Sequence, residues 1–159
     1  MRPRFSQNSA PGIIRAMMGI EEYLSGCGIE ERLLELVRLR ASQINGCAYC
    51  IDMHWKILRS LGENEQRLYG LGTWEESPYY SERERAALAW TEAVTNIRDS
   101  RAPDEVYEDV HKQFSSEAEL ANLTLAVAGI NAFNRLAIAS RAPAGTYQPT
   151  KAHKEAKSA

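Results

Sequence analysis

Two cysteines and a histidine lie close together near the middle of the first half of the chain. Cys47 and Cys50 form a Cys-x-x-Cys pair, and His54 follows four residues later. In a helix, residues three and four apart share a face, so the three side chains would follow one another turn by turn. The two sulfurs can then close a short disulfide, and the imidazole can take up a thiol proton or stabilise a thiolate. The spacing therefore predicts thiol redox chemistry.

The residues before the pair predict that it begins a helix. Asn45 and Gly46 both tolerate the left-handed conformation that ends many helices, so we expect a new helix to start around Cys47. The first turn of a helix carries free backbone N–H groups and the positive end of the helix dipole, which favour a thiolate, the reactive form of cysteine. By this argument alone Cys47, nearer the helix start, would be more reactive than Cys50.

Other uses of these residues stay open. Cys47, Cys50 and His54 could bind zinc, with Cys27 or Glu35 as a fourth ligand, but no second Cys-x-x-Cys or histidine pair completes such a site. Buried cysteines also occur simply as core residues. A thioredoxin fold would need a strand before the motif, whereas a long helical segment precedes it here. We therefore expect no metal and no cofactor.

Almost every segment that could position these residues has a helical pattern. The fold class is predicted to be all-α, with about six to eight helices and the Cys-x-x-Cys pair at the start of a central one. A single domain is expected over residues 1–140, followed by a flexible C-terminal tail or inter-subunit arm over 141–159. The predicted helices cover 13–24, 30–44, 47–61, 64–71 and 81–97, with one opening at 103 and a last one over 116–139.

Two segments carry clear helix-start signals. Ser81 with Glu84, and Ser116 with Glu119, each fit a capping box. The apolar residues behind the first cap recur every three or four positions as far as Ile97, which predicts a stripe facing the core. The segment 30–44 is apolar around most of its circumference, and we expect it to be buried on several sides.

Composition narrows the classes of protein. The chain is 44% hydrophobic and 25% charged with a net charge of −2, and it has no basic stripe, so we expect no nucleic-acid partner. Its N-terminus lacks the apolar run of a secretion signal, which together with only three cysteines predicts a cytoplasmic protein. The most apolar stretch, 120–133, is shorter than the about 20 residues of a membrane span and is expected to be a buried helix, with no membrane partner.

Residues 35–50, ELVRLRASQINGCAYC, followed by His54, resemble the core of the AhpD-like alkylhydroperoxidases of the carboxymuconolactone decarboxylase superfamily. The match is strongest over 30–71 and looser through 81–97 and 131–136. The resemblance implies an all-helical protein that assembles into a homo-oligomer, a trimer or hexamer. It implies reduction of a hydroperoxide, with Cys50 as the peroxidatic thiol and Cys47 as the resolving one, and with Glu35 and His54 as a proton relay. An external thiol reductant would restore the pair.

The chain departs from the best-known members of that family at one position beside the pair. Those members carry a histidine immediately before the second cysteine, where this chain has Tyr49. Tyrosine donates a hydrogen bond but is a poor base near neutral pH. Because the decarboxylase branch does not rely on a cysteine pair, keeping both cysteines argues against that branch.

Several alternatives accompany this interpretation. The same cysteines could serve a protein disulfide oxidoreductase or a redox sensor, or the chain could be a metal-binding scaffold. Glu35 could be a surface charge or an ion-pair partner of an arginine. A set of aromatic residues could form the walls of a pocket, although such residues more often pack a core or an interface: Trp55, Trp74, Tyr79 and Tyr80.

Overall fold

The computed structural model describes residues 2–6 and 9–149, and all regular structure in these ranges is helical. The eight α-helices and one 3-10 helix are α1 (Pro11–Ser25), α2 (Glu31–Asn45), α3 (Ala48–Ser60), α4 (Glu65–Tyr69), η2 (Gly70–Thr73), α5 (Glu82–Thr95), α6 (Ile97–Ser100), α7 (Asp104–Gln113) and α8 (Glu117–Ser140). The predicted all-α class is confirmed.

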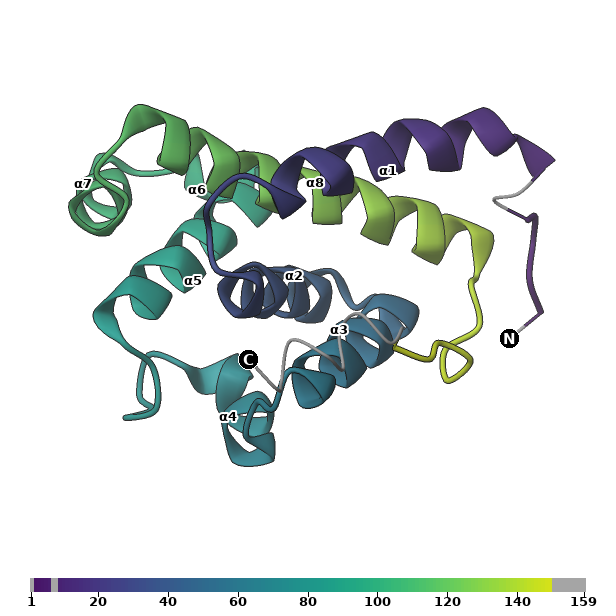
Figure 1. Cartoon of the computed structure of the whole chain (residues 1–159), viewed down its shortest axis with the longest axis horizontal. Coiled ribbons are helices and arrows are strands. Elements are labelled where there is room, and N and C mark those ends of the chain that lie inside the picture. The colour runs from purple at the N-terminus through teal and green to yellow at the C-terminus, as the bar shows by residue number, and fades with distance from the viewer. Residues whose placement is uncertain (1, 7–8, 150–159) are drawn as a thin grey trace.

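Helix α2 occupies the centre of the molecule and packs against α3, α5 and α8 (Figure 1). Nine of its fifteen residues are buried, in agreement with its apolar pattern. Helix α1 runs along α8 over one side of α2, and α7 packs against α5 at the opposite end from α3. A central helix surrounded in this way gives rigid support to any side chain it directs toward α3.

Helix α8 combines the length of a membrane span with the packing of a core helix. By length and composition it is the one described helix that could cross a membrane, but 44% of its most apolar window is buried. It packs against α1, α2, α3 and α5. The helix predicted over 116–139 is thus present as α8, with bounds shifted by one residue.

Of the two predicted capping boxes, the structure forms one completely and the other only in part. Ser81 and Glu84 form both halves of a capping box at the start of α5. Ser116 Oγ accepts the backbone N–H of Glu119 at 3.1 Å, but the returning contact expected from Glu119 is not made. Its carboxylate instead accepts from Arg83 at 2.5 Å, because an ion pair to α5 is within reach. The predicted second capping box is therefore wrong in its second half.

The end of α5 also differs from its expected pattern. The predicted apolar stripe ran as far as Ile97, but α5 ends at Thr95 and Asn96 interrupts it. Ile97 begins the short helix α6 and its side chain is 53% exposed. The apolar spacing continued past the point where the backbone turns, which spacing alone does not reveal.

The aromatic candidates for pocket walls belong mostly to the core. Trp74 and Tyr80 are buried in an apolar cluster with Leu36, Leu39 and other leucines, and Trp55 packs against it. Tyr79 is 41% exposed. These residues hold α4 and η2 against α2 and α5, and the expectation that aromatic residues pack the core is confirmed for Trp74 and Tyr80.

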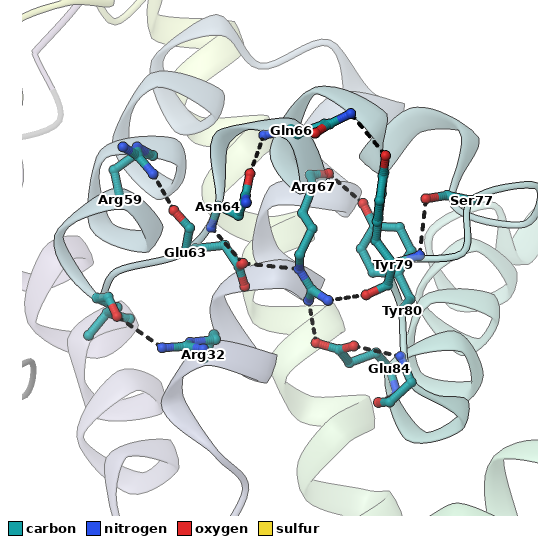
Figure 2. Close-up of polar contacts among 12 residues, drawn as sticks. Arg32, Arg59, Glu63, Asn64, Gln66, Arg67, Ser77, Tyr79, Tyr80 and Glu84 are labelled. Atoms are coloured by element: carbon teal, nitrogen blue, oxygen red, sulfur yellow. Dashed lines mark hydrogen bonds and ion pairs between the residues drawn. The ribbon is translucent and has the colours of Figure 1, made fainter.

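A polar cluster centred on the buried Glu63 fixes the turn that follows α3 (Figure 2). Its carboxylate accepts the backbone N–H of Asn64 at 2.8 Å and lies 3.0 Å from Arg67 Nε. Arg67 also donates to Glu84 at 2.6 Å, and Tyr80 donates its hydroxyl hydrogen to the Arg67 carbonyl. We call Glu63, Arg67, Tyr80 and Glu84 the Glu63 cluster. The cluster connects α4 to α5, because Arg67 of α4 binds the Glu84 carboxylate and accepts the Tyr80 hydroxyl at its backbone carbonyl.

Candidate active site

Cys47 and Cys50 form a disulfide at the start of α3. Cys47 is the N-cap residue and Cys50 lies in the first turn, with a Cα–Cα distance of 5.4 Å. Gly46 adopts the left-handed conformation with φ 69° and ends α2, as Asn45-Gly46 predicted. Only Gly46 and Cys47 separate α2 from α3, so the fold delivers the pair directly from its central helix.

Both sulfurs are covered by protein. Cys47 is 1% exposed and Cys50 is 2% exposed, and both pack against Ala137 of α8, with Tyr49 and Ala142 alongside. The Cys47 sulfur also lies 3.3 Å from the backbone N–H of Cys50, which donates to it. That donor is one of the free N–H groups of a helix start, and it favours a thiolate at Cys47 once the disulfide is reduced.

His54 lies one turn after Cys50 on α3 and meets Glu35 of α2. The distance from His54 Nδ1 to Glu35 Oε2 is 2.7 Å, and the two residues are each 4% exposed. The structure thus brings together the residues that sequence reasoning grouped: the two cysteines, His54 and Glu35.

The Glu35 carboxylate is held ionised by two partners. Burial by itself would raise its pKa, but attraction to and hydrogen bonding with His54 and Arg38 outweigh burial and lower the pKa to about 2. Arg38 donates to Glu35 Oε1 at 2.6 Å and, with its other terminal nitrogen, to Glu21 of α1 at 2.6 Å. We call Glu21, Glu35, Arg38 and His54 the Glu35 cluster. Glu35 is therefore no surface charge: it is buried, ion-paired with Arg38 and bonded to His54.

The ionised Glu35 determines which nitrogen of His54 is basic. A carboxylate only accepts hydrogen bonds, so His54 Nδ1 must carry the hydrogen between them. In the neutral imidazole this leaves the lone pair on Nε2. Nε2 is buried and has no hydrogen-bond partner among the described residues. A carboxylate that orients an imidazole in this way is the usual support for a histidine acting as a base.

A set of buried amides holds the end of α2 beside the cysteines. Asn45 donates to Asn131 at 3.0 Å and to Asn134 at 2.9 Å on α8, and Asn134 donates to Ser42 at 3.0 Å. The looser resemblance over 131–136 covers two of these residues, but sequence reasoning gave them no role. Their spacing of three on α8 was the available signal, because it places both amides on one face.

Three further features near the site were missed. Arg38 was not singled out, although it lies three residues after Glu35. Asp52 accepts the backbone N–H of Gly145 at 3.1 Å, and Lys56 donates to the Gly145 and Tyr147 carbonyls at 3.3 and 3.1 Å. Residues 141–149 therefore lie along α3, while 150–159 of the predicted tail lie outside the described residues.

The phenol of Tyr147 comes within electrostatic reach of the site. Burial, with the negative charge of Glu35 and the neighbouring Tyr49, raises the pKa of Tyr147. Within the ranges that the structure covers, no group of three histidine, cysteine, aspartate or glutamate side chains has the arrangement of a metal site. What the geometry offers is a dithiol–disulfide pair next to an oriented imidazole.

Comparisons with known proteins place the chain in a family. The model of the carboxymuconolactone decarboxylase family matches residues 11–93, which include the cysteine pair, His54 and Glu35. YdfG of Bacillus subtilis, an uncharacterised protein, is 42% identical over 130 residues, covering 82% of this chain and 88% of YdfG.

Solved structures give the same assignment. A crystal structure from Agrobacterium tumefaciens, of a protein of unknown function whose proposed identity is the antioxidant defence protein AhpD, has a TM-score of 0.87 and 39% identity. It covers 92% of this chain and 100% of that one. The debrominase Bmp8 shares the fold, with a TM-score of 0.78 at 21% identity over 87% of this chain and 74% of its own. The chain is an AhpD-like member of the carboxymuconolactone decarboxylase family.

Proposed function

We propose that this protein is a thiol peroxidase that reduces organic hydroperoxides with Cys50 and Cys47. The observation that carries the proposal is the pairing of His54 Nδ1 with the ionised Glu35, one turn from a cysteine pair already joined as a disulfide. That pairing leaves a basic Nε2 available to take the thiol proton of Cys50. Family membership supports the same role.

The reaction would proceed in three balanced steps. The Cys50 thiolate attacks the peroxide O–O bond, becomes a sulfenic acid and releases an alkoxide, which takes the proton held by His54 and leaves as an alcohol. The Cys47 thiol condenses with the sulfenic acid, forming the disulfide and releasing water. An external dithiol then reduces the disulfide by exchange and is itself oxidised.

The two cysteines have different surroundings, which supports giving them different roles. Cys50 shares a helix face with His54, whereas Cys47 receives a backbone N–H as the N-cap residue. A base next to Cys50 suits the thiol that attacks peroxide. A backbone donor at Cys47 suits the thiol that must ionise to resolve the sulfenic acid.

Burial favours a small substrate over a protein disulfide. With both cysteine residues at most 2% exposed, a disulfide carried by a folded protein has no open surface on which to dock against them. A hydroperoxide is small enough to reach Cys50 through a narrow approach. The rival function of a protein disulfide oxidoreductase has no comparable feature in its favour.

Thiol counting after a single turnover tests the proposal. Reduced protein is given one equivalent of cumene hydroperoxide, and free thiols are then titrated. We expect the three thiols of the chain to fall to one, since Cys27 is the free cysteine outside the pair. Cys50→Ser should abolish the reaction, and Cys47→Ser should stop at a sulfenic acid that dimedone traps on residue 50.

Cys27→Ser is the matched control and should still lose two thiols. If Cys50→Ser consumes peroxide at the wild-type rate, the assignment of the peroxidatic thiol is wrong. If the wild-type protein retains all its thiols while the peroxide persists, the proposed function itself fails.

A further inference from the structure

A cavity of about 590 Å³ lies where the N-terminal arm, residues 2–6, crosses the ends of α1 and α8. The backbone N–H of Arg4 donates to the Ser140 carbonyl at 3.0 Å and holds the arm against α8. We call this cavity the arm groove; the residues that matter here are Arg4, Phe5, Ile14, Tyr49, Arg141 and Ala142. Its volume falls within the range of about 300–1,000 Å³ typical of small-molecule sites.

The arm groove is next to the cysteine pair. Tyr49 and Ala142 line the groove, and the same two residues pack against the cluster formed by Cys47, Cys50 and Ala137. The groove and the cluster that contains the two cysteines therefore share two residues. Tyr49 is also the residue at which this chain departs from the best-known AhpD-like proteins.

The lining of the groove combines apolar surface with free positive charge. Phe5 and Ile14 supply apolar walls, and Phe5 is 51% exposed. Arg4 and Arg141 supply guanidinium groups, and neither forms an ion pair with a described residue. By contrast, Arg38 and Arg67 each contact two carboxylates. An arginine without an acidic partner at the edge of an apolar cavity is suited to a carboxylate ligand.

We propose that the arm groove binds an organic hydroperoxide that carries a carboxylate, such as a fatty-acid hydroperoxide. Arg4 and Arg141 bind the carboxylate, the hydrocarbon chain lies against Phe5 and Ile14, and the peroxide group reaches Cys50 past Tyr49. This inference rests on the proposed peroxidase function and names the substrate class for it. It assigns a role to the arm, which no motif in the sequence indicated.

Binding to the oxidised protein tests the groove without any turnover. Octanoate and octanol serve as probes in calorimetry, because they share a chain and differ in charge. We expect octanoate to bind about tenfold more tightly than octanol, and Arg4→Gln and Arg141→Gln each to weaken octanoate about tenfold, the loss of one charged hydrogen bond. Arg2→Gln, which removes the same charge from the same arm outside the groove, should change the affinity by less than about twofold.

Turnover then connects the groove to the chemistry. With the hydroperoxide of linoleic acid and with cumene hydroperoxide, Arg4→Gln and Arg141→Gln should raise KM for the fatty-acid substrate about tenfold more than for the neutral one. The proposed carboxylate site would be wrong if octanol bound as tightly as octanoate, or if neither substitution weakened octanoate binding. Either result would leave the proposed peroxidase function standing. If octanoate binding depended on the arginines but neither peroxide were reduced, the proposed peroxidase function would be wrong, and so would the proposed substrate class.

Discussion

Two buried glutamates have similar arginine partners but differ in the other groups that surround them. Glu35 and Glu63 are 4% and 3% exposed, and each is next to an arginine that also contacts a second carboxylate. Beyond Glu35, however, lies His54 with a free nitrogen, next to the cysteine pair. Beyond Glu63 lie an arginine, backbone groups and the Tyr80 phenol, all of which keep their protons near neutral pH (Figure 2).

This difference supports the proposed proton relay through Glu35 and His54, and it favours a structural role for Glu63. A carboxylate–arginine pair by itself keeps a negative charge buried in a fixed place, and both clusters do this. Only the Glu35 cluster contains an imidazole, a side chain that can both accept and donate a proton, and the Nε2 atom of that imidazole has no hydrogen-bond partner among the described residues. Burial and ion pairing alone therefore do not favour a role in proton transfer; the favourable feature is the histidine that the carboxylate orients.

The comparison is tested most strongly by making the same substitution in both clusters. Glu35→Gln should slow the single-turnover loss of thiols by roughly 10²–10³-fold, because an amide cannot hold His54 in its Nδ1–H form as a carboxylate does. Glu63→Gln should leave the rate per folded molecule unchanged and lower the free energy of unfolding by about 1–3 kcal/mol. The measurement is quenched-flow thiol titration with cumene hydroperoxide, with unfolding in urea. Equal rate losses in the two variants would mean that Glu35, like Glu63, has a structural role.

Lowering the pH should remove the part of the free energy of unfolding that depends on the ionised Glu35. Its pKa is lowered from 4.5 to about 2, so the stabilisation is complete above about pH 4.5 and disappears as the pH falls toward 2. The difference in free energy of unfolding between wild type and Glu35→Gln should shrink by roughly 3 kcal/mol over that window. Urea unfolding followed by circular dichroism at several pH values measures it. A difference that stays constant with pH would contradict an ionised Glu35.

The smallest effect is expected at the phenol of the Glu63 cluster. Burial, together with the charges of Glu63 and Glu84 and against that of Arg67, raises the pKa of Tyr80 to about 12, so its hydroxyl keeps donating to the Arg67 carbonyl at ordinary pH. Tyr80→Phe should cost about 1 kcal/mol and leave the rate of thiol loss unchanged. Thermal unfolding and the same thiol assay measure both quantities. A slowed reaction would show that the two clusters are coupled.

The local part of the site was predictable from the sequence, and the long-range part was not. Cys47, Cys50 and His54 follow from helix spacing and from the Asn45-Gly46 stop, because these are contacts within one or two turns. Glu35 came from the family resemblance, and its contact with His54 depends on how α2 packs against α3. No periodicity specifies that packing.

In the fold, too, local features were predictable from the sequence and long-range contacts were not. The helices and most of their starts could be read from caps and apolar spacing, whereas Ile97 showed that spacing can continue past a turn. Glu119 showed that a capping partner can be captured by a distant arginine, here Arg83. The arm groove was unpredictable for a similar reason: its arginines, at positions 4 and 141, meet only because the two ends of the described chain lie together.

The short span of the disulfide has a consequence for the proposed redox cycle. The disulfide spans only three positions within one turn, so opening it releases a very short loop and adds little freedom to the unfolded chain. We therefore expect oxidation to raise the free energy of unfolding by no more than about 2 kcal/mol, at the low end of the range for disulfides. A protein that cycles between dithiol and disulfide, as proposed, would then do so without loosening the helices that hold His54 in place.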